Sequence, residues 1–162
     1  MTVMFECTTV LPTDIETAFA LALDIDEHIA SMAPSGERAI GGVRTGTIGL
    51  TEEVTWRARH FGVPFTMTSR ITELERPSRF VDSQVRGPFQ RFRHEHRFEV
   101  VDGGTRLFDR VEFDARCGPI GRVVERLLLE RYLRQLIDQR NTHLRTTAAR
   151  PRASADDHPP AG

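Results

Sequence analysis

The sequence predicts an α+β fold in which a curved antiparallel sheet of about seven strands wraps round one long C-terminal helix. Three observations lead to this prediction. Apolar and polar residues alternate in short runs through most of residues 38–113, as in strands with one buried face. Glycine and proline separate these runs. Helical periodicity then continues from Ile120 to about Leu144, which is roughly 37 Å at 1.5 Å per residue and long enough to cross a whole sheet.

The first part of the chain predicts one strand followed by two short helices. Residues Val3–Leu11 are rich in β-branched side chains, and Pro12 ends this strand. Thr13 followed by Glu16 forms a capping box that starts the first helix. A second short helix is expected over residues 25–32. Both helices therefore lie between the first and second strands.

The remaining strands are expected between the short helices and the long one. Four of them are predicted at Arg38–Gly42, Ile48–Ala58, Phe65–Ile71 and Phe80–Arg86. The last two form a hairpin that ends at Phe113. The helices carry apolar faces that only the sheet can cover, so they are expected to pack against it.

The hairpin sequence restricts the pairing of its two strands. If Asp102–Gly103 form a two-residue loop, paired residue numbers sum to 205 and His96 lies opposite Asp109. If Gly103–Gly104 form the loop, the sum is 207, and Asp109 faces Phe98 and lies diagonal to His96. Both registers keep inward residues opposite inward residues, and both place a carboxylate near an imidazole.

Three polar residues of this hairpin, His94, His96 and Asp109, occupy positions expected to face the interior. An isolated buried carboxylate is very costly, so Asp109 must be paired, and this pairing can be purely structural. The same carboxylate could instead fix one imidazole tautomer, so that His96 transfers protons. A third alternative is a metal held by the two histidines and the aspartate. Cupin sites of this kind need a later strand histidine, which is absent here, so no metal is expected.

The order of elements resembles the START-like, or SRPBCC, helix-grip superfamily, and within it the polyketide cyclase/dehydrase and lipid-transport group. The resemblance covers about residues 2–145. It rests on the following residues: Gly87-Pro88-Phe89, then His94, His96 and Phe98, then Asp109, then Gly118-Pro119-Ile120-Gly121 before the last helix. It implies a cavity for an apolar or aromatic small molecule, in proteins that bind, carry or cyclise their ligands.

Two functions from different classes follow from the residues and the resemblance. The first is binding of a small hydrophobic or aromatic ligand between the sheet and the C-terminal helix. The alternative is a cyclase or dehydratase in which His96 and Asp109 are catalytic, and no cofactor is expected for either function. The expected pocket residues are Trp56, Met67, Phe92, His94, His96, Phe98, Asp109, Val111 and Leu128.

Composition excludes several other classes of function. The net charge is −1, and the 17 arginines of residues 76–162 are interleaved with 12 acidic residues. This pattern is typical of a solvated surface, so no nucleic-acid partner is expected. No apolar run is long enough for a membrane span, and the N-terminus has no signal-peptide pattern. With two cysteines only, a reduced cytoplasmic protein is expected, as a monomer or homodimer.

Residues 1–145 are predicted to form one domain. Residues 146–162 are rich in Ala, Pro, Ser, Asp and Arg and carry no large apolar side chain, which predicts a disordered tail.

Overall fold

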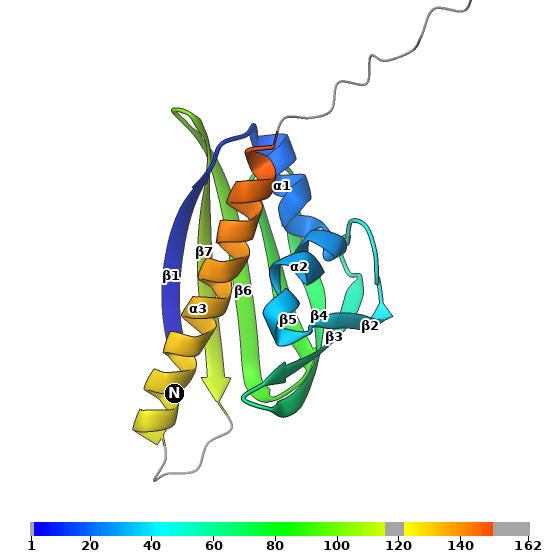
Figure 1. Ribbon diagram of the computed structural model, residues 1–162, viewed down its shortest axis with the longest axis vertical. Coiled ribbons are helices and arrows are strands. Elements are labelled where there is room, and N and C mark those ends of the chain that lie inside the picture. The colour runs from blue at the N-terminus through cyan, green and yellow to red at the C-terminus, as the bar shows by residue number, and fades with distance from the viewer. Residues whose placement is uncertain (1, 116–121, 151–162) are drawn as a thin grey trace, which may run out of the picture.

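The computed structural model describes residues 2–115 and 122–150 as one seven-stranded antiparallel sheet with helices on one face (Figure 1). The order of strands across the sheet is β1-β7-β6-β5-β4-β3-β2. The strands are β1 (Val3–Leu11), β2 (Arg38–Gly42), β3 (Glu53–His60), β4 (Val63–Glu75), β5 (Arg79–Arg86), β6 (Phe89–Val101) and β7 (Gly104–Ala115). The predicted α+β helix-grip fold is therefore confirmed.

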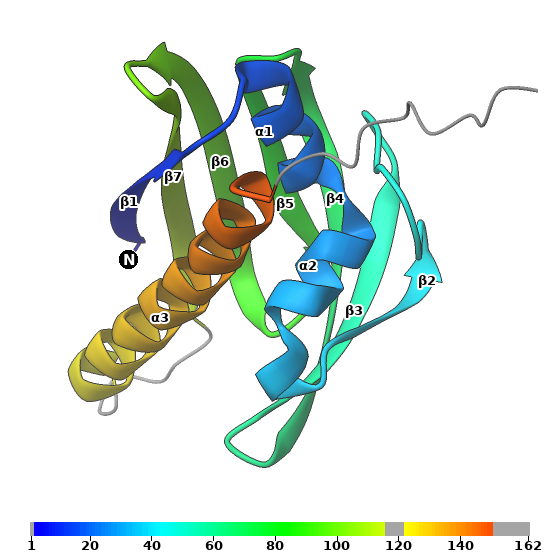
Figure 2. The same ribbon diagram turned by 45° about the horizontal axis from the view of Figure 1, so that its top comes forward.

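Three α-helices and one short 3₁₀ helix accompany the sheet. They are α1 (Ile15–Leu23), α2 (Ile25–Ser31), η1 (Ala33–Ser35) and α3 (Arg122–Ala148). Figure 2 shows the sheet curving around the side on which α3 and the α1–α2 pair lie. Two polar contacts tie α3 to these short helices, because Gln139 donates to the carbonyl of Ser31 and Arg140 to that of Ala22. The helices and the curved sheet thus enclose a common interior.

The hairpin of β6 and β7 has the first of the two predicted registers. Val101 pairs with Gly104 and His96 with Asp109, so paired numbers sum to 205. Gly103 has a φ of 82°, the left-handed conformation that an Asp-Gly turn requires.

Two predictions at the N-terminal side are wrong in detail. Asp14, not Thr13, is the N-cap of α1, and its carboxylate accepts from the backbone N–H of Thr17 at 2.8 Å. The strand expected over Ile48–Ala58 begins only at Glu53. Its first part is a turn in which Thr51 has a positive φ of 67°, so the alternation of residues 48–52 does not reflect a strand.

The buried face of α3 differs from the one predicted. Leu128 was expected in the pocket, but it is 62% exposed. Ile137 and Leu144 are buried instead, and the partly buried Leu129 and Leu133 pack beside the core. An apolar pattern that drifts round a long helix does not by itself fix which side meets the sheet, and here the contact side excludes Leu128.

The predicted start of the tail is also too early. The helix continues to Ala148, and Thr147 donates its hydroxyl to Glu27 at 3.3 Å. Residues 151–162 lie outside the described part of the chain, as do Gly118-Pro119-Ile120-Gly121 before the helix.

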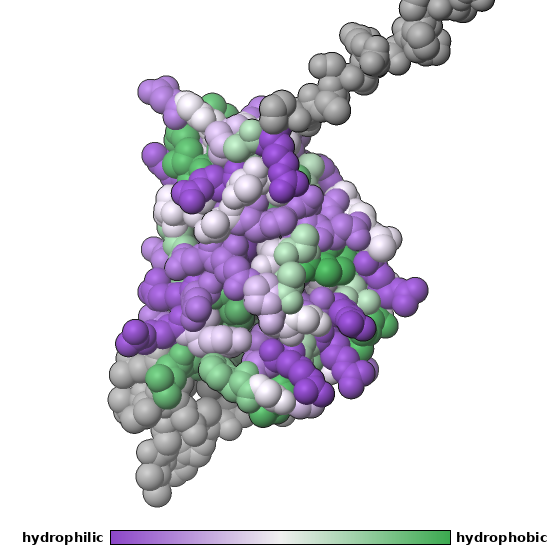
Figure 3. All heavy atoms as spheres, in the orientation of Figure 1, coloured by the Kyte–Doolittle hydropathy of each residue, from purple (hydrophilic) through white to green (hydrophobic). Residues whose placement is uncertain are grey.

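The surface on the helix side is largely hydrophilic where its residues are coloured, with hydrophobic atoms in small separate groups (Figure 3). Across the described residues, the helices are either too short or too polar to cross a membrane.

Candidate ligand-binding site

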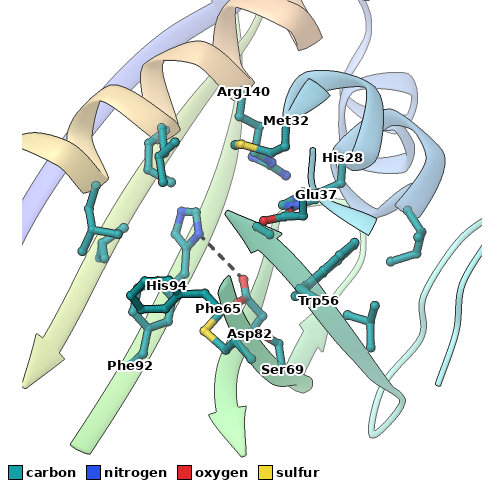
Figure 4. A pocket seen from close by; sticks show the side chains of 18 of the residues that line it. His28, Met32, Glu37, Trp56, Phe65, Ser69, Asp82, Phe92, His94 and Arg140 are labelled. Atoms are coloured by element: carbon teal, nitrogen blue, oxygen red, sulfur yellow. Dashed lines mark hydrogen bonds and ion pairs between the residues drawn. The ribbon is translucent and has the colours of Figure 1, made fainter. Parts of the chain in front are cut away.

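A cavity of about 230 Å³ lies between the sheet and the helices α2 and α3. Apolar side chains make up most of its wall, among them Trp56, Phe65, Met67, Phe92, Leu133 and Ile137. Polar residues also line it, among them Asp82, His94, His96 and Arg140. Figure 4 shows Arg140 reaching down from α3 while Asp82 and His94 rise from the sheet. The cavity therefore combines an apolar body with a polar side.

Six of the nine predicted pocket residues line this cavity. They are Trp56, Met67, Phe92, His94, His96 and Val111. The other three do not. Phe98 packs against Phe19 at 5.2 Å between ring centroids, Asp109 is 0% exposed behind the wall, and Leu128 is on the outer surface. The predicted strand face was right, but Phe98 belongs to the packed core beyond the end of the cavity.

Asp109 is held by side chains from two elements. Its Oδ1 lies 2.9 Å from Nε2 of His94, and its Oδ2 accepts from Nδ2 of Asn141 at 2.6 Å. Burial alone would raise the pKa of Asp109, but the hydrogen bond from His94 and the charge of His96 hold it well below its ordinary value. Because an ionised carboxylate only accepts hydrogen bonds, Nε2 of His94 must carry a proton.

His96 has a different partner from the one predicted. Its Nδ1 comes within 2.8 Å of Oδ1 of Asp109, as the register requires, but the N–H direction does not give a hydrogen bond. Its hydrogen bond runs from Nε2 to Oδ2 of Asp82 at 3.1 Å. The bond expected between His96 and Asp109 is made instead by His94, which is the diagonal neighbour of Asp109.

The second nitrogen of His94 faces the cavity side of the cluster. Nδ1 lies 3.8 Å from Oδ2 of Asp82, too far for a hydrogen bond. Burial and the neighbouring His96 lower the pKa of His94, against the opposing effect of Asp109 and Asp82. In the described residues, Asp82, His94 and His96 are also the group whose ligand atoms are arranged to hold a metal ion, all within 4.8 Å of one another.

Arg140 is a buried cation with incomplete hydrogen bonding. It is 5% exposed, its Nη2 donates to the carbonyl of Ala22 at 2.9 Å, and its Nη1 has no partner in the described part of the chain. Burial lowers the pKa of Arg140, while the carboxylates of Asp109 and Asp82 act in the opposite direction. A partly satisfied guanidinium in an apolar cavity wall can donate to an oxygen that enters the cavity.

Two pairs, each with one histidine, also line the cavity. His28 lies 2.5 Å from Glu37 and stacks on Trp56 at 4.3 Å between centroids. His60 lies 2.5 Å from the hydroxyl of Tyr132. His28 thus connects α2 to β3, and His60 connects β3 to α3, at the wall of the cavity.

Three residues of the site, Asp82, Arg140 and Asn141, were not predicted from the sequence. A period-two reading would have placed Asp82 on the same strand face as the buried Phe80. Arg140 and Asn141 lie three and four positions after Ile137, so they share its buried helix face. In each case the usable signal was a charged or amide residue on a face assigned to the interior.

Comparison with known proteins places this architecture in a family. The model of the family described as polyketide cyclase/dehydrase and lipid transport matches residues 2–149. The chain belongs to this family. No curated protein sequence matches it.

Solved structures agree with the family at the level of the fold. The Zhui aromatase/cyclase from Streptomyces sp. R1128 superposes with a TM-score of 0.72 at 17% identity, covering 91% of this chain and 94% of that one. The protein TTHA0849 from Thermus thermophilus gives 0.71 at 17%, covering 91% and 97%. The major latex-like protein 151 from Panax ginseng gives 0.66 at 11%, covering 92% and 99%. This polyketide cyclase/dehydrase and lipid transport family member thus has a ligand-binding helix-grip fold.

Proposed function

We propose that the protein binds one small aromatic or otherwise apolar ligand, bearing a hydrogen-bond-accepting oxygen, in the cavity between the sheet and α3. The observation that carries this proposal is Arg140, a buried guanidinium with a spare donor beside an apolar lining. Leaving a buried donor unpaired costs about 1–3 kcal/mol, so a ligand oxygen that accepts from it adds affinity.

The size of the cavity limits the ligand to a compact molecule. A closed apolar cavity of about 150 Å³ holds benzene. At about 230 Å³, the present cavity suits a molecule of one or two rings. The single tryptophan, Trp56, is part of the lining, so its fluorescence reports on occupancy.

The test is titration of the purified protein with 2-naphthol and with naphthalene, in EDTA, by calorimetry and Trp56 fluorescence. Arg140→Met should weaken 2-naphthol binding by about 10- to 100-fold and leave naphthalene binding almost unchanged. The matched control is Arg131→Met, on the exposed side of the same helix, which should leave both unchanged. Equal weakening of both ligands by Arg140→Met, or no quenching of Trp56, would contradict the proposal.

A second candidate function is cyclisation or dehydration, and the observation that favours it is the orientation of His94. Asp109 fixes one nitrogen of this imidazole, and the other has no hydrogen-bond partner among the residues that the structure describes. Such an imidazole could take a proton from the carbon beside a ketone and return it to a hydroxyl that leaves as water. His94 is better placed for this role than His96, because the nitrogens of His96 lie 3.1 and 2.8 Å from carboxylate oxygens, whereas Nδ1 of His94 is 3.8 Å from Asp82.

The assay for this second function is the conversion of heptane-2,6-dione to 3-methylcyclohex-2-enone, an intramolecular aldol condensation that releases water. The wild-type protein should accelerate it. His94→Gln should abolish the acceleration while 2-naphthol still binds, and His143→Gln, at a histidine that does not line the cavity, should keep both. No acceleration by the wild-type protein would leave binding as the function.

A further inference from the structure

Asp82, His94 and His96 form a three-residue cluster on two neighbouring strands. Asp82 of β5 pairs with His94 of β6, and His96 follows two positions later on the same strand face. We infer that this cluster is a binding site for one divalent transition-metal ion, with His94 Nδ1, His96 Nε2 and a carboxylate oxygen of Asp82 as ligands. The sequence had suggested Asp109 as the carboxylate, but the structure places Asp109 on the other side of the two rings.

The position of His96 between two carboxylates supports a cation. Its Nε2 is 3.1 Å from Asp82 and its Nδ1 is 2.8 Å from Asp109. Both carboxylates accept only, and a neutral imidazole has one N–H. A neutral ring can therefore serve only one of the two contacts, whereas a metal ion between His96 and Asp82 would leave the single N–H for Asp109. Consistent with this mismatch, the buried Nδ1 of His96 has no hydrogen bond to any described residue.

Asp109 has the position of an outer partner of metal-bound histidines. Its Oδ1 is 2.9 Å from Nε2 of His94 and 2.8 Å from Nδ1 of His96, so it faces the nitrogen of each ring that points away from Asp82. Metal-bound histidines almost always donate this second N–H to a carboxylate, carbonyl or water. Asn141 fixes the carboxylate through its other oxygen at 2.6 Å. With a metal bound, a small rotation of His96 would let both rings donate to Asp109.

The spacing of the three ligand atoms suits a metal centre. Bonds of 2.0–2.2 Å in a tetrahedron place neighbouring ligand atoms about 3.4 Å apart. The two distances to Oδ2 of Asp82 are 3.1 Å from His96 and 3.8 Å from His94, on either side of this value. All three atoms lie within 4.8 Å of one another, so side-chain rotation alone can bring them together.

The donor set and the surrounding charges select the class of ion. Two imidazoles and one carboxylate favour Zn²⁺, Fe²⁺, Co²⁺ or Ni²⁺ over Mg²⁺ or Ca²⁺, which prefer oxygen ligands. Asp109 and Asp82 supply two negative charges near the site, against one positive charge from Arg140. Three protein ligands leave coordination positions toward the cavity. A metal here would use the nitrogen of His94 that proton transfer requires, so the two roles exclude each other in one molecule.

The test is titration of EDTA-treated, dialysed protein with Co²⁺ and with Zn²⁺ by calorimetry, with the visible absorption of Co²⁺ as a report on coordination. We expect one equivalent to bind and the melting temperature to rise. Asp82→Ala should weaken binding by more than about 100-fold, and Asp109→Asn by about 10- to 100-fold, as for an outer partner. His60→Gln, which changes another cavity histidine, is the matched control and should bind normally.

Histidine ¹⁵N NMR of the wild-type protein keeps the test decisive if a variant fails to fold. Zn²⁺ should move the signals of His94 Nδ1 and His96 Nε2 and leave those of His60 unchanged. No saturable binding of either ion, or equal binding by folded Asp82→Ala, would overturn the inference. Binding of 2-naphthol in EDTA is independent of this result, so failure of the metal site and failure of the proposed ligand binding are distinguishable.

Discussion

Asn141 of α3 donates its side-chain amide to Oδ2 of Asp109 in β7 at 2.6 Å, and both residues are buried. This hydrogen bond joins the long helix directly to the strand that carries the carboxylate. It also leaves Oδ1 of Asp109 to the histidines of β6. A single amide on the helix therefore fixes the orientation of a cluster built on the sheet.

The first prediction concerns this bond. Asn141→Leu should lower the free energy of unfolding by about 1–3 kcal/mol, because it leaves one oxygen of a buried carboxylate without its donor. Urea denaturation measures the change. Gln135→Leu, at an exposed position of the same helix, should change stability by less than about 0.5 kcal/mol. Equal effects from the two variants would show that the buried bond contributes nothing.

The second prediction separates the two sides of α3. Leu128→Asp should be tolerated within about 0.5 kcal/mol, because Leu128 is 62% exposed. Leu144→Asp should unfold the protein or make it aggregate, because Leu144 is 1% exposed within the core and an unpaired charge there is very costly. Circular dichroism melting of both variants is the measurement. The reverse ranking would mean that the helix packs with a different face.

The fold was predictable because its signals are local. Strand alternation, the Asp102–Gly103 turn and the long run without glycine or proline each act over a few residues. The hairpin turn limited the register to two alternatives, and the structure has the one that places His96 opposite Asp109.

The partners within the site were less predictable because they depend on contacts between distant elements. Only Gly87 and Pro88 separate β5 from β6, but the two strands pair only from Ser83 and Arg93 onward, so the turn did not fix their register and Asp82 could not be assigned to His96 in advance. Likewise, the rotation of α3 about its own axis decides whether Asn141 or Leu128 faces the sheet, and only packing sets that rotation.

The third prediction concerns the C-terminal boundary. Deleting residues 151–162 should leave the melting temperature unchanged, because this segment has no large apolar side chain. Deleting residues 146–162 should lower it by several degrees, because Thr147 hydrogen-bonds to Glu27 and Ala148 packs against the core. A loss of about 1 kcal/mol corresponds to ~2–4 °C in a domain of this size. Equal melting temperatures for the two truncations would return the boundary to residue 145.

The last prediction concerns Glu95, which lies on β6 between the two histidines but on the opposite strand face. It is 4% exposed and accepts from Arg79 at 2.8 Å, Arg93 at 2.9 Å and Arg97 at 2.6 Å. Burial would raise the pKa of Glu95, but these three guanidinium groups hold it at about 2. The carboxylate is therefore the common partner of three cations on the outer face of the sheet.

Neutralising this carboxylate should be strongly destabilising. Glu95→Gln keeps the shape of the side chain but removes the charge and replaces one acceptor oxygen by an NH₂ donor. At least one arginine therefore loses a charge-assisted bond of about 1.5–3 kcal/mol, and the others keep only a neutral acceptor. Urea denaturation at neutral pH should show a loss of ~2 kcal/mol or more. The control is Glu99→Gln on the same strand face, whose carboxylate is 67% exposed beside Arg106 and should contribute less than about 1 kcal/mol. If Glu95→Gln lowers the free energy of unfolding no more than its control does, the three contacts only offset the cost of burying the charge.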